Sequence, residues 1–241
     1  MKGLCCRNFW LICVCLYYTG SYGQSPQPRK QYNRSDLTEA DSTRLAAEYG
    51  GNKTLIPAYT LQTLIALSYF PELKNSRIRF VLKATRSPLQ TKPVFPNLLG
   101  SRSKRKFAIT ISDSSIVKLE PLLLERMDFN AQVGVIGHEL SHASDFSNRS
   151  AWSLIGSGIG HLSSKYIDRF EYRTDSICIA HGLGFQLLAW SRFVRATLHS
   201  ENYDGSDNID MPVMDHERYM NPSTILTRME AIPIYTEALQ K

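Results

Sequence analysis

The chain has 241 residues, of which 43% are hydrophobic and 21% charged, and a formal net charge of +6. This length suits one compact domain with a sizeable core, or two small lobes. After the first two dozen residues no apolar run approaches the length of a membrane span, which argues against a multi-pass membrane protein. The modest basic excess comes without a known nucleic-acid-binding module or interleaved aromatic residues, so nucleic-acid binding finds no support.

The N-terminus has the pattern of a cleavable secretory signal. Lys2 and Arg7 precede an apolar run over residues 9–18, and small residues lie one and three positions before a cut after Gly23. We therefore predict a signal peptide over residues 1–23 and an exported protein, periplasmic or extracellular, with no transmembrane segment in the mature chain. The alternative is a retained anchor, for which the apolar run is short.

Cysteine usage follows from this signal. Four of the five cysteines, Cys5, Cys6, Cys13 and Cys15, lie within it, so the mature chain keeps only Cys178. An intrachain disulfide is then excluded, and stability must come from the core and any metal. We expect Cys178 to be a small buried apolar residue rather than a ligand or nucleophile.

The segment after the signal changes in composition. Residues 24–35 are rich in proline, glutamine, lysine and arginine, which predicts a disordered leader. The folded domain is therefore expected to span residues 36–241. Its first elements are two predicted helices, over residues 36–48 and 56–69, the second ended by Pro71.

Two half-buried strands are predicted next, over residues 77–84 and 106–112, where apolar and polar side chains alternate. The intervening residues 85–100 contain three prolines and are expected to form a loop. Basic residues cluster at 102–106, beside the second strand. A solvated loop is the expected interpretation of this cluster, with attraction to an anionic partner as the alternative.

The next predicted helix carries the most informative motif. Residues 130–146 contain no proline and have apolar side chains at three- and four-residue spacing. Within them lies an H-E-x-x-H motif at His138, Glu139 and His142. Histidines four apart point the same way, so both can bind one zinc while the glutamate reaches a metal-bound water. We expect Gly134, one turn earlier, to leave room for metal and substrate. The alternative is a core helix with two hydrogen-bonded histidines.

A catalytic zinc usually holds three protein ligands and keeps one position for water, so a third ligand is needed. A metzincin would have glycine at position 145 and a ligand at position 148, where this chain has Asp145 and Asn148. Asp145 would reach the metal only with strain. His161 is one remaining candidate, and Glu171 is the favoured one.

Glu171 is favoured because it begins an E-x-x-x-D pattern with Asp175 on a helix predicted over residues 164–180. The four-residue spacing places both carboxylates on one face. Glu171 can complete a His₂Glu zinc site, and Asp175 can accept the second ring N–H of a zinc-bound histidine. Paired carboxylates on a helix usually mark a solvated face; their position after H-E-x-x-H favours the metal interpretation.

With these two motifs, the chain over about residues 107–184 resembles the gluzincin metallopeptidases, the thermolysin-like clan. It is most similar to the prenyl-protein-peptidase and HtpX-like group, although members of that group often have membrane-spanning helices. The resemblance implies a small zincin-like catalytic domain with an active-site helix, a second zinc-ligand helix and a short β-sheet. It also implies that Zn²⁺ is bound by His138, His142 and Glu171, that Glu139 is the general base and that Asp175 orients a ligand histidine.

The resemblance bears on two further segments. In gluzincins a strand beside the active-site helix pairs with the extended substrate backbone, and residues 107–111 occupy a matching position in the sequence. An ordinary internal strand is the alternative. Residues 150–160, between the two motif helices, are expected to form a packed connection, with a mobile flap over the cleft as the alternative.

The C-terminal part is predicted to contain a helix over residues 185–198 and a last helix near the end. Hydrolysis needs a donor that stabilises the tetrahedral oxyanion. His216 and Tyr219 are the candidates, and His181 and His199 are less favoured.

The sequence therefore predicts a mostly helical α+β domain that acts as a secreted or periplasmic zinc-dependent metallopeptidase on a peptide or protein substrate. One alternative is a zinc amidase or endopeptidase acting on peptidoglycan, which would use the same chemistry. Another is a catalytically silent, zinc-stabilised binding protein, against which the intact Glu139 counts. The sequence specifies neither the cleavage preference nor the oligomeric state.

Overall fold

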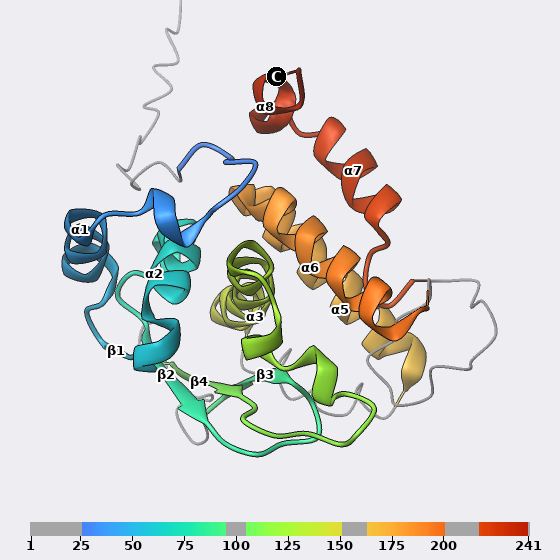
Figure 1. Ribbon diagram of the computed structural model, residues 1–241, viewed down its shortest axis with the longest axis horizontal. Coiled ribbons are helices and arrows are strands. Elements are labelled where there is room, and N and C mark those ends of the chain that lie inside the picture. The colour runs from blue at the N-terminus through green and yellow to red at the C-terminus, as the bar shows by residue number, and fades with distance from the viewer. Residues whose placement is uncertain (1–25, 95–104, 151–162, 201–216, 241) are drawn as a thin grey trace, which may run out of the picture.

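A long helix, α3, runs through the centre of the molecule, and the other elements surround it (Figure 1). The computed structural model describes residues 26–94, 105–150, 163–200 and 217–240. Its helices are α1 (Glu39–Tyr49), α2 (Thr60–Ser68), α3 (Phe129–Asn148), α5 (Ser164–Cys178), α6 (Gly184–Leu198), α7 (Pro222–Glu230) and α8 (Thr236–Gln240). The strands are β1 (Lys53–Thr54), β2 (Arg77–Leu82), β3 (Leu89–Pro93) and β4 (Lys106–Ile111). Short 3₁₀ turns are η1 (Arg34–Asp36), η2 (Pro57–Tyr59), η3 (Pro71–Leu73), η6 (Glu120–Leu122), η7 (Leu124–Arg126) and η9 (Pro233–Tyr235), and η8 (Ile179–Leu183) is a π-helical turn.

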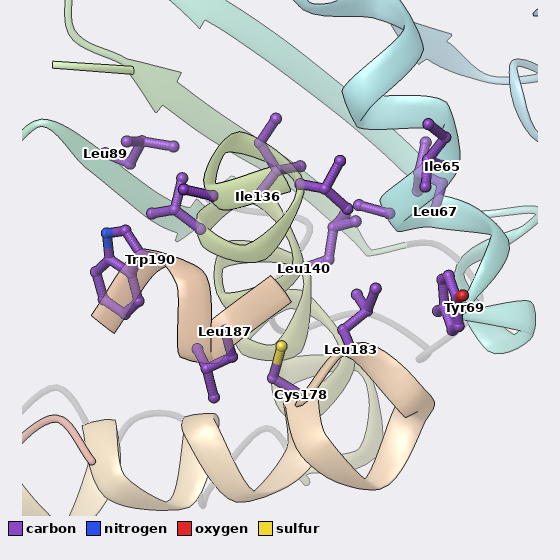
Figure 2. Packing of buried hydrophobic residues seen from close by; sticks show 14 of the residues in the cluster. Ile65, Leu67, Tyr69, Leu89, Ile136, Leu140, Cys178, Leu183, Leu187 and Trp190 are labelled. Carbon is purple, nitrogen blue, oxygen red and sulfur yellow. The ribbon is translucent and has the colours of Figure 1, made fainter. Parts of the chain in front are cut away.

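These elements form a mostly helical α+β fold, which confirms the predicted class. The sheet lies along one side of α3 and α2 lies along a second side. Helices α5 and α6 pack against the side of α3 that faces away from α2 (Figure 1). Apolar side chains from all of these elements meet around α3, as Figure 2 shows for Leu89, Ile136, Leu187 and others. The central helix is therefore held by packing on nearly every side.

The strand order of the sheet is β1-β2-β4-β3. β1, β2 and β4 run parallel, whereas β3 pairs antiparallel with β4 and lies at the edge. Strand β3 corrects the prediction that residues 85–100 form only a loop. Pro88 precedes this strand and Pro93 ends it, and an edge strand tolerates proline because one side of its backbone needs no sheet partner.

The two faces of the sheet differ in chemistry. Alternate residues of β2 and β4, among them Ile78, Phe80, Phe107 and Ile109, are buried in the core. The opposite face carries the basic side chains Arg77, Arg79, Lys92 and Lys106, placed on one side by the strand register. The buried face is the one directed to α3.

Residues 26–35 lie on the core, which corrects the predicted disordered leader for the described part of that segment. The backbone N–H of Tyr32 donates to Oδ1 of Asn130 at 2.9 Å, and its hydroxyl is 2.7 Å from that of Tyr69. Nε2 of Gln186 donates to the carbonyl oxygen of Arg29 at 2.8 Å. Ordered structure therefore begins before residue 36, and residues 1–25, including the predicted signal, lie outside the described residues.

Arg105 supports the C-terminal end of α3. It belongs to the basic cluster at 102–106, yet it is buried, and its Nη1 donates to the carbonyl oxygens of Phe146 at 2.6 Å and Arg149 at 2.7 Å. A cation at this end of a helix satisfies free carbonyl groups and complements the helix dipole. At Arg105 the expectation of a solvated loop is therefore wrong.

Gly134 permits the close contact between α3 and α6. A Cβ atom at this position would lie 2.1 Å from the backbone oxygen of Gln186 and 2.9 Å from the nitrogen of Leu187. The absent side chain thus accommodates the backbone of α6. The expectation that Gly134 leaves room for metal and substrate is wrong.

Helices α5 and α6 form one helical run with the turn η8 between them. In the described part of the chain, this run, Ser164–Leu198, is the one helix long and apolar enough to cross a membrane, and most of its apolar stretch is buried inside the protein. Gly182 interrupts it with a φ of 100°. The hydroxyl of Tyr235 donates to the carbonyl oxygen of Ile179 at 2.6 Å and accepts from the N–H of Gly184 at 2.8 Å, so the irregular turn keeps hydrogen-bond partners.

Candidate metal centre

Helix α3 presents both motif histidines toward α5. The side chain of Asp128 caps its first turn by accepting from the N–H of Ala131 at 2.9 Å. His138 and His142 follow one turn apart, with ring centroids 4.8 Å from each other. Both rings are buried, and Glu171 of α5 faces them.

Three ligand-capable atoms converge at this point. Oε2 of Glu171 lies 3.2 Å from Nε2 of His138 and 3.2 Å from Nε2 of His142, and the ligand atoms of all three residues lie within 4.8 Å of one another. In a tetrahedral zinc site with bonds of about 2.0–2.1 Å, neighbouring ligand atoms are separated by about 3.3 Å. The spacing of the carboxylate from both imidazoles therefore suits a zinc ion, and two imidazoles with one carboxylate form a suitable donor set.

Hydrogen bonds at the far ring nitrogens fix both tautomers. Nδ1 of His138 donates to Oδ1 of Asp175 at 2.8 Å. The hydroxyl of Thr174 donates to the carbonyl oxygen of Phe170 at 2.9 Å, which leaves it to accept from Nδ1 of His142 at 3.1 Å. In the neutral form that binds metal, each ring therefore carries its proton on Nδ1 and directs its Nε2 lone pair to the metal position.

The electrostatics of the site favour a cation. Burial opposes protonation of His138, but the hydrogen bonds and charges of Asp175 and Glu171 outweigh burial and raise the pKa of its ring to about 10. Burial likewise opposes ionisation of Glu171, yet the charges of and hydrogen bonds from His142 and His138 hold the pKa of its carboxyl well below the usual range. Two carboxylates and two imidazoles thus create a pocket of negative charge that a divalent metal would balance.

Glu139 lies beside the two histidines and is held by the sheet. Oγ1 of Thr91, on β3, is 2.7 Å from Oε2 of Glu139 and 3.0 Å from its backbone oxygen. Glu139 is buried, at 5% exposure. The edge strand therefore contacts the residue expected to act as general base.

A small recess adjoins these groups. Its volume of about 30 Å³ is sufficient to hold a water molecule. His138 and Glu139 line it together with Trp190 and Tyr219. The rings of Trp190 and Tyr219 lie 5.3 and 5.7 Å from that of His138. The remaining wall is mostly apolar and contains Ser87, Pro88, Leu89, Leu122, Met127, Val135 and Val194.

Of the oxyanion candidates, the structure brings Tyr219 to the recess, while His216 lies outside the described residues. His181 takes part in a different cluster, where Nδ1 donates to the carbonyl oxygen of Ile177 at 2.8 Å and Nε2 lies 3.0 Å from Oε1 of Glu72. His199 ends α6 and lines a separate open groove.

Of the two alternative third ligands, the structure places Asp145. Asp145 is buried in ion pairs with Nε of Arg149 at 2.7 Å and Nη2 of Arg173 at 2.9 Å, and it is not in the metal group. His161 and the connection over residues 151–162 lie outside the described residues.

Cys178 is fully buried, as expected of a small apolar residue. Burial and the nearby charge of Asp175 raise the pKa of its thiol, which keeps it protonated. Its Sγ would lie 3.4 Å from a Cβ placed at Gly137, so it packs against α3 one residue before the H-E-x-x-H motif (Figure 2).

Sequence reasoning missed three residues of the site. Thr174 lies three positions after Glu171, a spacing that places it on the same side of α5, and could have been found. Trp190 has no such signal, because only the crossing of α6 over α3 brings it to His138. Thr91 lies in a segment expected to be loop.

Comparison of the chain with models of protein families, with curated proteins and with solved structures gave no match. The functional assignment therefore depends on the geometry of the site. It shows a candidate metal site of His138, His142 and Glu171 on two packed helices, an arrangement consistent with a zincin-like site.

Proposed function

We propose that the protein is a zinc-dependent metallopeptidase that hydrolyses peptide bonds with water as the nucleophile. One observation carries the proposal: the Nε2 atoms of His138 and His142 converge with the carboxylate of Glu171, and Glu139 lines a recess together with His138. The signal predicted over residues 1–23 would place this activity in the periplasm or outside the cell.

The residues present would hold zinc through two imidazoles and one carboxylate and leave a fourth position for water or substrate. When bound, zinc would supply Lewis acidity, lowering the pKa of a water molecule and polarising the scissile carbonyl. Asp175 and Thr174 keep both imidazoles in the orientation that this requires.

Proton transfer falls to Glu139. Its carboxylate would take a proton from the attacking water and deliver it to the leaving amine. Tyr219 borders the recess beside His138 and is the donor we assign to the developing oxyanion.

The substrate backbone would pair with β3. Strand β4 is paired on both sides, with β2 and with β3, so the expectation that residues 107–111 bind substrate is wrong. β3 lies at one edge of the sheet formed by the described residues, and its Thr91 contacts Glu139. An extended peptide added to this edge would lie alongside the metal centre.

The proposal is tested with zinc-loaded wild type on a library of quenched fluorescent peptides and on unfolded casein, beside Glu139→Gln. A matched control is Glu230→Gln, because Glu230 is an exposed residue of α7. We expect cleavage by wild type and Glu230→Gln, and a loss of at least about 100-fold in kcat for Glu139→Gln with zinc retained.

Two outcomes would overturn the proposal. Cleavage of peptidoglycan fragments without cleavage of peptides or casein would assign the site to a cell-wall amidase or endopeptidase. Tight zinc binding with no turnover of either substrate class would assign it to a zinc-stabilised binding protein.

A further inference from the structure

Thr91 is the point at which the edge strand contacts the proposed general base. It lies on the inner face of β3, opposite Ile109 of β4, and therefore faces α3 rather than the basic outer face of the sheet. Its hydroxyl oxygen is 2.7 Å from Oε2 of Glu139 and 3.0 Å from the backbone oxygen of the same residue. Both distances allow a hydrogen bond.

A hydroxyl has one proton, so the two acceptors compete for it. The carboxylate oxygen is closer, and an ionised acceptor forms a shorter and stronger bond than a neutral carbonyl. The proton is therefore directed to Oε2 of Glu139. The β-branched side chain of Thr91 has few χ1 rotamers, which keeps this donor in place at little entropic cost.

We propose that Thr91 is a positioning residue that fixes the carboxylate of Glu139 for proton transfer. The hydrogen bond occupies Oε2 and leaves Oε1 to take the proton from water. The inference rests on the proposed peptidase function, to which it adds a residue outside both sequence motifs.

The placement of Thr91 also has a consequence for substrate binding. β3 is the strand to which we assign the substrate backbone, and its Thr91 side chain reaches Glu139 on α3. One short element would then align both the peptide and the base. A shift of about 1 Å in a reacting group can cost about 100-fold in rate, so this alignment matters for turnover.

The competing explanation is structural: Thr91 merely attaches β3 to α3. The test therefore compares three variants of the zinc-loaded full chain. Thr91→Val keeps the shape and removes the hydroxyl, Thr91→Ser keeps the hydroxyl, and Thr110→Val makes the same change on the outer face of β4, where no hydrogen bond of the side chain is described.

We expect Thr91→Val to lower kcat about 10- to 100-fold with KM within about twofold of wild type and with zinc content unchanged. Thr91→Ser should stay within about threefold of wild type, and Thr110→Val should be unaffected. Full kcat in Thr91→Val would overturn the inference, as would equal losses in Thr91→Val and Thr91→Ser accompanied by a lower Tm.

A second readout separates this inference from the peptidase proposal. Crystal structures of zinc-loaded wild type and Thr91→Val would show whether the Glu139 carboxylate moves, whatever the activity. A carboxylate that is ordered in wild type and displaced in Thr91→Val supports the positioning role even if no peptide is cleaved. An unchanged carboxylate overturns it.

Discussion

The carboxylate of Asp175 accepts a hydrogen bond from Nδ1 of His138 at 2.8 Å and uses its other oxygen to accept one from the backbone of Met220 at 2.7 Å. One buried side chain of α5 therefore orients a candidate ligand on α3 and anchors the segment that carries Tyr219. The metal site and the wall of the recess are joined through this carboxylate.

Replacing Asp175 with asparagine should weaken zinc binding. An asparagine has one acceptor oxygen, so either His138 or Met220 would face an amide NH₂ group instead of an acceptor. Loss of such a partner typically costs about 10- to 100-fold in metal affinity, which a competitive chelator titration measures. Thr174→Val, which removes the partner of His142, should cost less because a neutral hydroxyl is the weaker acceptor. Wild-type affinity in Asp175→Asn would contradict the assignment.

Gly134→Ala should destabilise the fold. The added methyl group would meet the backbone of Gln186 and Leu187, which cannot move without displacing α6. Overpacking of this kind costs about 1–3 kcal/mol. The gain in helix propensity from glycine to alanine is about 1 kcal/mol, so it offsets only the smallest of these costs. Given backbone contact at 2.1 Å, we expect the upper part of that range. Thermal unfolding beside Gly51→Ala, where a Cβ meets nothing within 4 Å, is the measurement. Equal Tm values for the two variants would refute the close helix contact.

The pair of Glu72 and His181 should make stability depend on pH. Burial opposes the charged form of each group, but His181 and Ser144 lower the pKa of Glu72 from 4.5, and Glu72 with the backbone of Ile177 raises the pKa of His181 from 6.5. The contribution of Glu72 is complete above pH 4.5 and is lost as the pH falls through its folded-state pKa. That of His181 is complete below pH 6.5 and is lost as the pH rises through its folded-state pKa.

Both contributions are therefore complete between pH 4.5 and 6.5. Chemical denaturation of wild type and Glu72→Gln from pH 3.5 to 9 should give a stability difference that is largest in that window and shrinks on both sides. The exposed Glu230→Gln variant serves as the control. A stability difference that is constant with pH would show that folding does not shift the pKa values of this pair as described.

Tyr32→Ala should destabilise the protein, although Tyr32 lies in a segment with the composition of a disordered leader. Tyr32 is 9% exposed, and its hydroxyl contacts that of Tyr69. Removing a buried aromatic side chain costs about 3 kcal/mol or more. Lys30→Ala, an exposed neighbour, should change the free energy of unfolding by less than about 0.5 kcal/mol. If the two variants unfold alike, residues 26–35 do not belong to the core.

Much of the helical framework could be predicted because it follows from local patterns. The apolar periodicity of α3 and the four-residue spacing of its histidines determine which side chains share a face, whatever the rest of the chain does. The same holds for Glu171 and Asp175 on α5. That the two pairs would meet at one metal was expected from the order of the two motifs and their resemblance to gluzincins, and not from periodicity.

The remaining features depend on contacts between distant segments. Strand β3 is short and bounded by prolines, and it forms because β4 offers it a partner. The role of Gly134 depends on the backbone of α6 beside it, which sequence spacing does not reveal. The composition of residues 26–35 predicts disorder, yet Tyr32 and the backbone of Arg29 find partners on α3 and α6.

The most direct test of the metal assignment is the zinc content per chain, measured by elemental mass spectrometry on purified mature wild type, Glu171→Ala and His161→Ala, each shown to be folded by circular dichroism. The His₂Glu site predicts one zinc in wild type and in His161→Ala and none in Glu171→Ala. Zinc retained in Glu171→Ala but lost in His161→Ala would contradict it.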